Sequence, residues 1–236
     1  PNGTVTTDTV GKITFEPNQD YNGVVTFPYQ ISDGNGGRST ANQEITVNSV
    51  NDFPVAVTDI YTTDEDTAIT LTPLTKGTAD SDSDGDVLVV SQINGVTITA
   101  GTPQTIPVTN GVVTTNAAGV ITFTPNQDYN GSITFPYQIS DGKGGTANAN
   151  QEITVNAIND RPIAVADTDT TPEDTLLNVN LVADGVLSND FDVDGNTLTV
   201  TAYTVGTSTG TIGQDLTITE GVIRINVDGT FTFDPA

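Results

Sequence analysis

Short runs of alternating apolar and polar residues, separated by turn-forming residues, recur along the whole chain. In one run, Ile133, Phe135, Tyr137 and Ile139 occupy every second position, so they lie on one face of an extended strand. Asn, Asp, Gly and Pro separate such runs, and no capped stretch has the periodicity of a helix. The pattern predicts an all-β protein.

The sequence also repeats itself at a spacing of 108 residues. Residues 1–50 and 109–158 are identical at 35 of 50 aligned positions, and Asn51-Asp52-Phe53-Pro54 returns as Asn159-Asp160-Arg161-Pro162. Tandem units of this length are a common domain size. If each unit starts at its Asn-Asp dipeptide, the chain holds three parts. These are the C-terminal part of a first repeat (1–50), a complete repeat (51–158) and the N-terminal part of a third (159–236).

In this phase the chain begins and ends inside repeats, and two explanations are open. The chain is an excerpt from a longer array, or it is a subunit whose partial domains complete each other between neighbouring chains. The two partial repeats together are longer than one repeat, and they duplicate one strand. We therefore expect an excerpt.

Within the complete repeat the alternation predicts nine short strands. They are expected over residues 54–61, 68–72, 87–93, 95–99, 105–108, 111–114, 120–124, 132–139 and 151–156. Seven or more short strands in about 100 residues, with turns between them, are typical of an immunoglobulin-like β-sandwich. The expected architecture is a series of such sandwiches, each about 108 residues long, joined end to end.

The composition is strongly acidic and excludes several kinds of function. Thirty acidic side chains stand against six basic ones, for a net charge of −24, and Cys, Met, His and Trp are absent. Without thiols or imidazoles there is no cysteine nucleophile, histidine base or conventional zinc ligand set. Six scattered cations cannot neutralise a nucleic-acid backbone, so we expect no nucleic-acid partner. No apolar run reaches the ~18–20 residues that span a bilayer, so we expect no membrane insertion by this segment.

Aspartate supplies 24 of the 30 acidic residues and gathers in two loops, residues 80–86 and 190–196. Each loop places carboxylates at alternate positions and contains a glycine that permits a tight turn. A solvated acidic turn is the alternative to a cation site, but carboxylates this close repel each other without a counter-ion, and their oxygens suit Ca²⁺. The loops are not EF-hands, because Ser91 and Thr201 stand at the twelfth position, where a bidentate Glu is required. Each loop is therefore an incomplete cage that needs further ligands.

The order of the strands indicates where those ligands come from. The first strand should run from the Asn51-Asp52 linker to the far pole of the domain, and the second should return. Each junction between repeats then gathers acid from the preceding domain, the linker and the following domain. At the first junction the candidate ligands are Asp20, Asn51, Asp52, Asp80, Asp82, Asp84 and Asp86, with Asp141 in a hairpin at the same pole. At the second they are Glu65, Asp66, Asp128, Asn159, Asp160, Asp190, Asp192, Asp194 and Asn196.

Four motifs together resemble those of a known family. They are an Asn-Asp-x-Pro linker, a Glu-Asp-Thr that begins 14 residues after its Asn, an Asp-x-Asp-x-Asp-Gly loop and a closing Tyr-x-Ile-Ser-Asp-Gly. The whole chain is similar to the bacterial cadherin-like repeats that form the extender regions of large secreted adhesins of the repeats-in-toxin type. The resemblance implies cadherin-like sandwiches with calcium between successive domains. It also implies secretion to the bacterial cell surface, with neighbouring repeats of the same chain, and like chains in a fibre, as partners.

The third repeat departs from this pattern. Pro172 stands where the second repeat has Asp64, and Phe191 and Val193 replace Ser81 and Ser83. We therefore expect the geometry of the second junction to differ from that of the first.

The composition and motifs leave three classes of function to consider. The first is a non-enzymatic, calcium-rigidified spacer of a cell-surface adhesin or filament that supports adhesion or biofilm formation. The second is a calcium-dependent module that binds carbohydrate or another surface, although Trp is absent and the Tyr residues recur at core-like positions. The third is an enzyme with paired carboxylates, for which aspartates in Gly-rich turns are poor candidates. The near-identity of the repeats favours the spacer, because a recognition site need occur only once.

Overall fold

A computed structural model of the chain describes residues 2–236 and consists almost entirely of β-strands and turns. The chain forms two compact units, one that ends at Ala157 and one that spans Ile158–Ala236. A single 3₁₀ turn, η1 (Val182–Asp184), is the only helical element of the described residues. No helix in the described part of the chain is long and apolar enough to cross a membrane.

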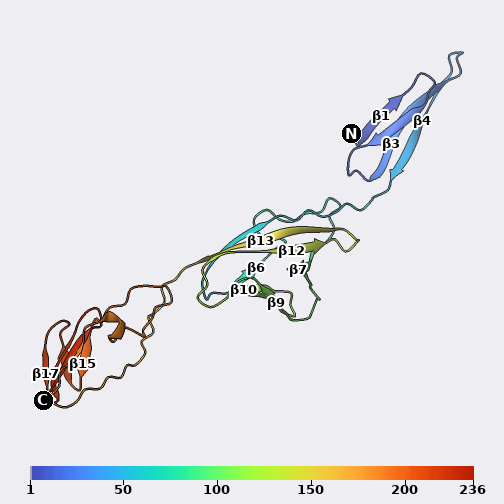
Figure 1. Cartoon of the computed structure of the whole chain (residues 1–236). Coiled ribbons are helices and arrows are strands. Elements are labelled where there is room, and N and C mark those ends of the chain that lie inside the picture. The colour runs from blue at the N-terminus through green and yellow to red at the C-terminus, as the bar shows by residue number, and fades with distance from the viewer. Residues whose placement is uncertain (1) are drawn as a thin grey trace. The chain divides into compact units, whose positions relative to one another are not determined.

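The second repeat folds as a sandwich of two sheets (Figure 1). One sheet has the order β5 (Asp59–Asp64), β13 (Thr146–Asn156), β12 (Gly131–Ser140), β7 (Val89–Ile93) and β8 (Val96–Thr97). The other has the order β6 (Ile69–Leu71), β11 (Ile121–Pro125), β10 (Gly111–Thr115) and β9 (Gln104–Val108). Strands β5 and β13 are parallel, and all other pairs are antiparallel. The all-β expectation is confirmed.

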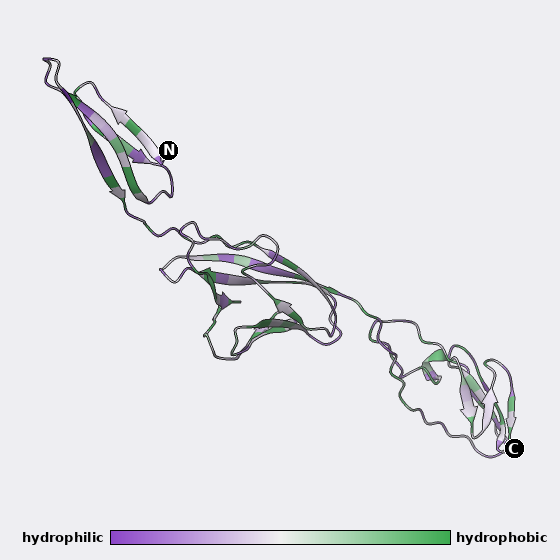
Figure 2. Cartoon of the chain, turned by 180° about the vertical axis from the view of Figure 1, so that it is seen from behind, coloured by the Kyte–Doolittle hydropathy of each residue, from purple (hydrophilic) through white to green (hydrophobic). Residues whose placement is uncertain are grey.

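The core of this sandwich follows from the alternation in the sequence. On β12, Ile133, Phe135, Tyr137 and Ile139 face inward and are at most 3% exposed. Figure 2 shows hydrophilic and hydrophobic residues alternating along the long strands. Phe123 of the opposite sheet is fully buried, and its ring centroid lies 6.1 Å from that of Phe135 in a tilted arrangement. Burial of these side chains supplies the main favourable free energy of folding.

The partial repeats use the same strand pairings. In the first, β1 (Gly3–Thr7) pairs with β2 (Ile13–Pro17), and β3 (Gly23–Ser32) with β4 (Arg38–Val47). In the third, the sheet order is β14 (Leu177–Val179), β19 (Phe231–Pro235), β18 (Gly221–Ile225) and β17 (Leu216–Ile218). A hairpin of β15 (Tyr203–Val205) and β16 (Ser208–Gly210) directly precedes β17 in the sequence. The order of β14, β19, β18 and β17 reproduces that of β6, β11, β10 and β9.

The largest errors in the expected strand boundaries are two strand starts, each five residues off, and both have a physical cause. The first strand begins at Asp59 rather than at residue 54, because the main chain before it bonds to the loop 80–86 instead of a strand: Val55 forms a single bridge with Ser81. The last strand begins at Thr146 rather than at residue 151, because its hairpin with β12 continues to the pair Ser140 and Thr146. Both of these segments lie at the pole of the sandwich that carries the loop 80–86.

The core predicts the effect of a truncation. Phe123→Ala should destabilise the second repeat by about 3–5 kcal/mol, because it removes buried apolar atoms and leaves a cavity. The matched control is Ile60→Ala on β5, whose side chain is 66% exposed and should cost less than about 1 kcal/mol. Urea unfolding followed by the amide NMR signals of β10 and β12 measures both. Equal effects would contradict the assignment of the core.

Candidate metal centre

The acidic loop of the second repeat folds around the side chain of Asp82. Its Oδ1 accepts hydrogen bonds from the backbone N–H groups of Asp84 (2.9 Å) and Asp86 (3.2 Å). Gly85 takes a φ of +74°, which glycine adopts without strain. An aspartate that bonds the main chain two residues ahead is a local turn signal. The loop therefore forms from its own sequence.

Two other carboxylates of the loop fasten it to the start of the repeat. Asp84 Oδ2 accepts from the backbone N–H of Asp52 at 2.7 Å, and Asp80 Oδ1 accepts from that of Val57 at 2.7 Å. Hydrogen bonds to an ionised acceptor are short and roughly twice as strong as neutral ones. The linker Asn51-Asp52 is thus held by its main chain against the loop.

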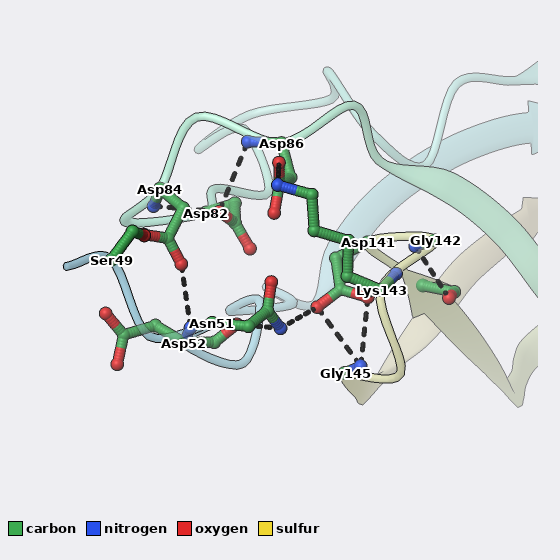
Figure 3. Close-up of polar contacts among 11 residues, drawn as sticks. Ser49, Asn51, Asp52, Asp82, Asp84, Asp86, Asp141, Gly142, Lys143 and Gly145 are labelled. Carbon is green, nitrogen blue, oxygen red and sulfur yellow. Dashed lines mark hydrogen bonds and ion pairs between the residues drawn. The ribbon is translucent and has the colours of Figure 1, made fainter.

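A third segment, the hairpin between β12 and β13, reaches the linker through Asp141 (Figure 3). This carboxylate is 4% exposed; Oδ1 accepts from the N–H groups of Lys143 and Gly145, and Oδ2 accepts from Asn51 Nδ2 at 2.8 Å. The Asn51 bond and the two N–H bonds lower the pKa of Asp141. A Cβ at Gly145 would collide with the same carboxylate. The ionised carboxylate of Asp141 therefore connects the hairpin to the linker through hydrogen bonds.

Several oxygens at this pole have no donor. Asn51 Oδ1, Asp82 Oδ2 and Asp86 Oδ2 are buried and accept no hydrogen bond. The carboxylates of Asp82, Asp84 and Asp86 each offer an oxygen within 4.8 Å of the others. Buried acceptors are nearly always satisfied in proteins, so a group of them calls for a cation. The chemistry of these atoms fits a hard divalent cation such as Ca²⁺.

The charge at this pole is unevenly balanced. Partial burial, followed by the negative charges of Asp20 and Asp84, raises the pKa of Asp52. Among the described residues, Lys143 is the cation paired with the loop, with its Nζ 2.6 Å from Asp86 Oδ1. The carboxylates here thus outnumber the single ammonium group that reaches them.

The core is joined to this pole by contacts of Tyr137 and Asp59, neither of which the sequence assigned to the site. The Tyr137 hydroxyl lies 3.0–3.1 Å from both Asp80 oxygens and 2.8 Å from the Val57 carbonyl. Asp59 is 2% exposed and accepts from Gln151 Nε2 at 2.7 Å. Burial raises the pKa of Asp59, the Gln151 bond opposes this, and the charge of Asp80 adds to it. In the sequence, Asp59 stands two residues before Tyr61, so both side chains lie on the inward face of the same strand.

Asp80 therefore differs from Asp82 and Asp86 of the same loop. Its Oδ1 accepts from Val57 N–H, and both of its oxygens lie within hydrogen-bond distance of the Tyr137 hydroxyl. Asp82 and Asp86 each keep one oxygen without a donor. The structure thus gives Asp80 a part in holding the loop to the sandwich and leaves the open acceptors to Asp82 and Asp86.

The third repeat builds the same loop within its own unit. Asp192 Oδ1 accepts from the N–H groups of Asp194 (3.0 Å) and Asn196 (3.2 Å). Asp194 Oδ2 accepts from Asp160 N–H and Asp190 Oδ1 from Val165 N–H, both at 2.8 Å. Asn196 Nδ2 lies 3.4 Å from Asn159 Oδ1. Phe191 and Val193 therefore leave the hydrogen bonds of the loop unchanged. The expected difference in junction geometry stays a prediction.

At the far pole of the second repeat, Glu65, Asp66 and Asp128 come together as the strand order predicted. Asp128 N–H donates to Asp66 Oδ1 at 3.1 Å, and Asn130 Nδ2 lies 3.4 Å from Glu65 Oε2. Asp66 and Asp128 have left-handed backbones, with φ of 56° and 55°. Asp20, the counterpart of Asp128 in the first repeat, has a φ of 57°. The predicted residues thus form three groups, the near and far poles of the second repeat and the near pole of the third. Their role as ligands stays a prediction.

The second repeat also has a cavity between its strands and loops. Its volume is about 780 Å³, and none of the residues described around it is charged or aromatic. Its wall includes Leu74, Leu88, Val90, Ile98, Thr115 and Ile121. Such a wall has no aromatic platform on which a sugar ring could stack.

Comparisons with protein families match consecutive parts of the chain. A cadherin-like domain model matches residues 1–48, a bacterial Ig domain model residues 51–154, and a bacterial cadherin-like domain model residues 159–236. The sequence finds no match among curated proteins.

Two similar solved structures are larger proteins. The endo-fucoidan hydrolase MfFcnA4 of glycoside hydrolase family 107 shares 18% identity at a TM-score of 0.31, over 100% of this chain and 33% of that one. Protocadherin gamma B2 extracellular cadherin domains 1–5 share 13% identity at a TM-score of 0.48, over 98% of this chain and 43% of that one. The chain spans less than half of either protein.

The buried Asp59 predicts a pH dependence. Because burial raises its pKa in the folded state, folding favours its protonated form. Its contribution to stability is therefore complete below the unfolded pKa of about 3.9 and is lost as the pH rises through the raised folded pKa. Wild type should gain stability relative to Asp59→Asn as the pH falls from 7.

This difference can be measured by urea unfolding in chelator at several pH values between 3.5 and 7. Thr62→Ser, on the exposed face of β5, changes no titratable group and should differ from wild type by a constant amount. A wild-type advantage over Asp59→Asn that stays flat, or shrinks towards acid, would overturn the assignment of Asp59 as a buried carboxyl.

Proposed function

We propose that this chain, whose consecutive parts match cadherin-like, bacterial Ig and bacterial cadherin-like domain models, is a calcium-rigidified spacer of a secreted bacterial adhesin or extracellular filament. Domains of this kind are typically extracellular and non-enzymatic. Cadherin-like domains generally bind Ca²⁺. In this role the repeats support adhesion or biofilm formation by holding a distal binding domain away from the cell.

The observation that carries this proposal is the set of buried oxygens without donors at Asn51, Asp82 and Asp86. Each is an acceptor, and Ca²⁺ takes six to eight oxygen ligands in flexible geometry. When bound, the ion supplies positive charge among carboxylates that otherwise repel one another. In the second repeat, Asp82, Asp84, Asp86 and Asn51 would hold it. In the third, the corresponding residues are Asp192, Asp194, Asn196 and Asn159.

The protein's own part is to bring the linker to the ion. Asp52 is bonded through its main chain to Asp84, and Asn51 through its side chain to Asp141. An ion held by the loop, and also by Asp20 of the preceding repeat, would fix the linker in one geometry. Motion is the default when an interface between domains is small, so the ion would supply the stiffness. At the far pole of the second repeat we assign a ligand role to Glu65, Asp66 and Asp128, and within the third repeat we assign one to Asp160.

The spacer is favoured over a carbohydrate-binding module by two features. The cavity of the second repeat has neither charged nor aromatic residues in its described wall. The loop has the same hydrogen bonds in two successive repeats, as a structural device does. The partners are then the neighbouring repeats of the same chain and, in a fibre, like chains.

Calcium should therefore stabilise the fold, and magnesium should substitute poorly, because Mg²⁺ demands a tighter octahedral site. At a free concentration 100 times the Kd, a bound ion adds about 2.7 kcal/mol to the free energy of unfolding. Thermal unfolding in chelator, in calcium and in magnesium measures the effect. Equal melting temperatures in chelator and in millimolar calcium would refute the proposal.

Two matched substitutions locate the sites. Asp82→Asn and Asp192→Asn each remove one charge from the same position of successive loops. Each should weaken calcium binding at its own repeat by about tenfold or more, because affinity follows the number of charged ligands. Calorimetric titration should show the other repeat's site unchanged. Loss of both sites in either variant would mean that the loops do not bind independently.

A further inference from the structure

The hairpin between β12 and β13 carries a lysine that reaches the acidic loop. Lys143 Nζ lies 2.6 Å from Asp86 Oδ1; the side chain of Asp86 is 12% exposed and that of Lys143 is 59% exposed. Figure 3 shows the side chain of Lys143 extending from the hairpin to Asp86. The other ion pair of the described residues, Arg224 with Asp215, lies in the third repeat. Of the described residues, Lys143 is thus the one that forms an ion pair with this loop.

The ammonium interacts with more than its direct partner. Its hydrogen bond to Asp86 and the charge of that residue raise the pKa of Lys143, and the charges of Asp84 and Asp82 act in the same direction. The ammonium group therefore lies in the field of three carboxylates that offer oxygens within 4.8 Å of one another. It is a partial counter-ion for the same oxygens to which we assign the metal.

The turn that presents Lys143 does not require a lysine. Asp141 Oδ1 accepts from the N–H groups of residues 143 and 145 at 2.8 and 2.9 Å. In the first repeat, Asp33 Oδ1 accepts from Asn35 and Gly37 at 2.8 and 2.9 Å. Asn35 stands at the position of Lys143 in this otherwise equivalent turn. The backbone of the turn is therefore set by Asp and Gly, and the residue at its tip is free to serve another purpose.

We propose that Lys143 is a tethered competitor that sets the calcium affinity of the loop Asp80–Asp86. The inference rests on the proposed function, because it assigns a regulator to the same site. A divalent ion that takes Asp86 as a ligand has to displace the ammonium group, and the long, half-exposed side chain can swing away into solvent. The loop then fills at a higher calcium concentration than an equivalent loop faced by asparagine.

The competitor also acts when calcium is scarce. The ammonium group offsets part of the repulsion among Asp82, Asp84 and Asp86, so the loop keeps its fold against the linker. Monovalent ions carry the same charge as the ammonium, which is held at the site by its tether, so they gain little by displacing it. Lys143 therefore favours divalent over monovalent ions at this loop.

The test compares calcium binding in full-chain variants that also carry Asp192→Asn, which weakens the third-repeat site so that one isotherm reports on the second. Lys143→Asn reproduces the hairpin of the first repeat. It should bind calcium about two- to fivefold more tightly, because the ion no longer has to break an exposed ion pair. Lys143→Arg keeps the charge and should stay close to the parent. Lys12→Asn, an equal change in net charge in the first repeat, should leave the affinity unchanged.

Thermal unfolding gives a second reading. In chelator, Lys143→Asn should melt at a lower temperature than the parent, and its melting temperature should rise more on adding calcium. An affinity for calcium equal to or weaker than that of the parent would overturn the role of Lys143 while leaving the calcium site standing. If the parent itself binds no calcium, the proposed function fails and this inference fails with it.

Discussion

The hydrogen bond between an aspartate carboxylate and a main-chain N–H group is the interaction on which this structure depends. In both repeats that contain the loop, one aspartate bonds its own turn, a second bonds the linker and a third bonds the first segment of the sandwich. An ionised acceptor makes these bonds strong, but it also concentrates negative charge in a small volume. The way in which the linker is held therefore creates the need for a cation.

The pole and the core are parts of one arrangement. Tyr137 is buried with the apolar side chains of β12, yet its hydroxyl meets Asp80 and the Val57 carbonyl. Asp59 lies beside it on β5, bonded to Gln151 of β13. Packing of the sandwich thus fixes Asp80, and Asp80 fixes the loop that carries Asp82, Asp84 and Asp86. The oxygens without donors, on Asp82 and Asp86, form no hydrogen bond with the sandwich.

The sequence predicted those features that depend on local pattern and on repetition. Alternation along β12 and the 108-residue repeat indicated sandwiches in tandem, and the strand order brought Asp141 to the linker and Asp128 to Asp66. It did not indicate that the Tyr137 hydroxyl contacts Asp80, or that Lys143 forms an ion pair with Asp86. Each of these contacts joins segments 57 residues apart. Such contacts follow from side-chain geometry in the folded state. The burial of Asp59 could have been predicted, because Asp59 lies on the same inward face of its strand as Tyr61.

Small-angle X-ray scattering of this chain, in chelator and in millimolar calcium, tests the central claim most directly. If calcium fixes linkers that the loops already hold, calcium should narrow the distribution of sizes and favour extended forms, whereas chelator should broaden it. Circular dichroism of the same samples should show that most of the β-structure is kept. An unchanged maximum dimension and flexibility profile would contradict the account, because the aspartate loops would then serve only the folding of their own repeats.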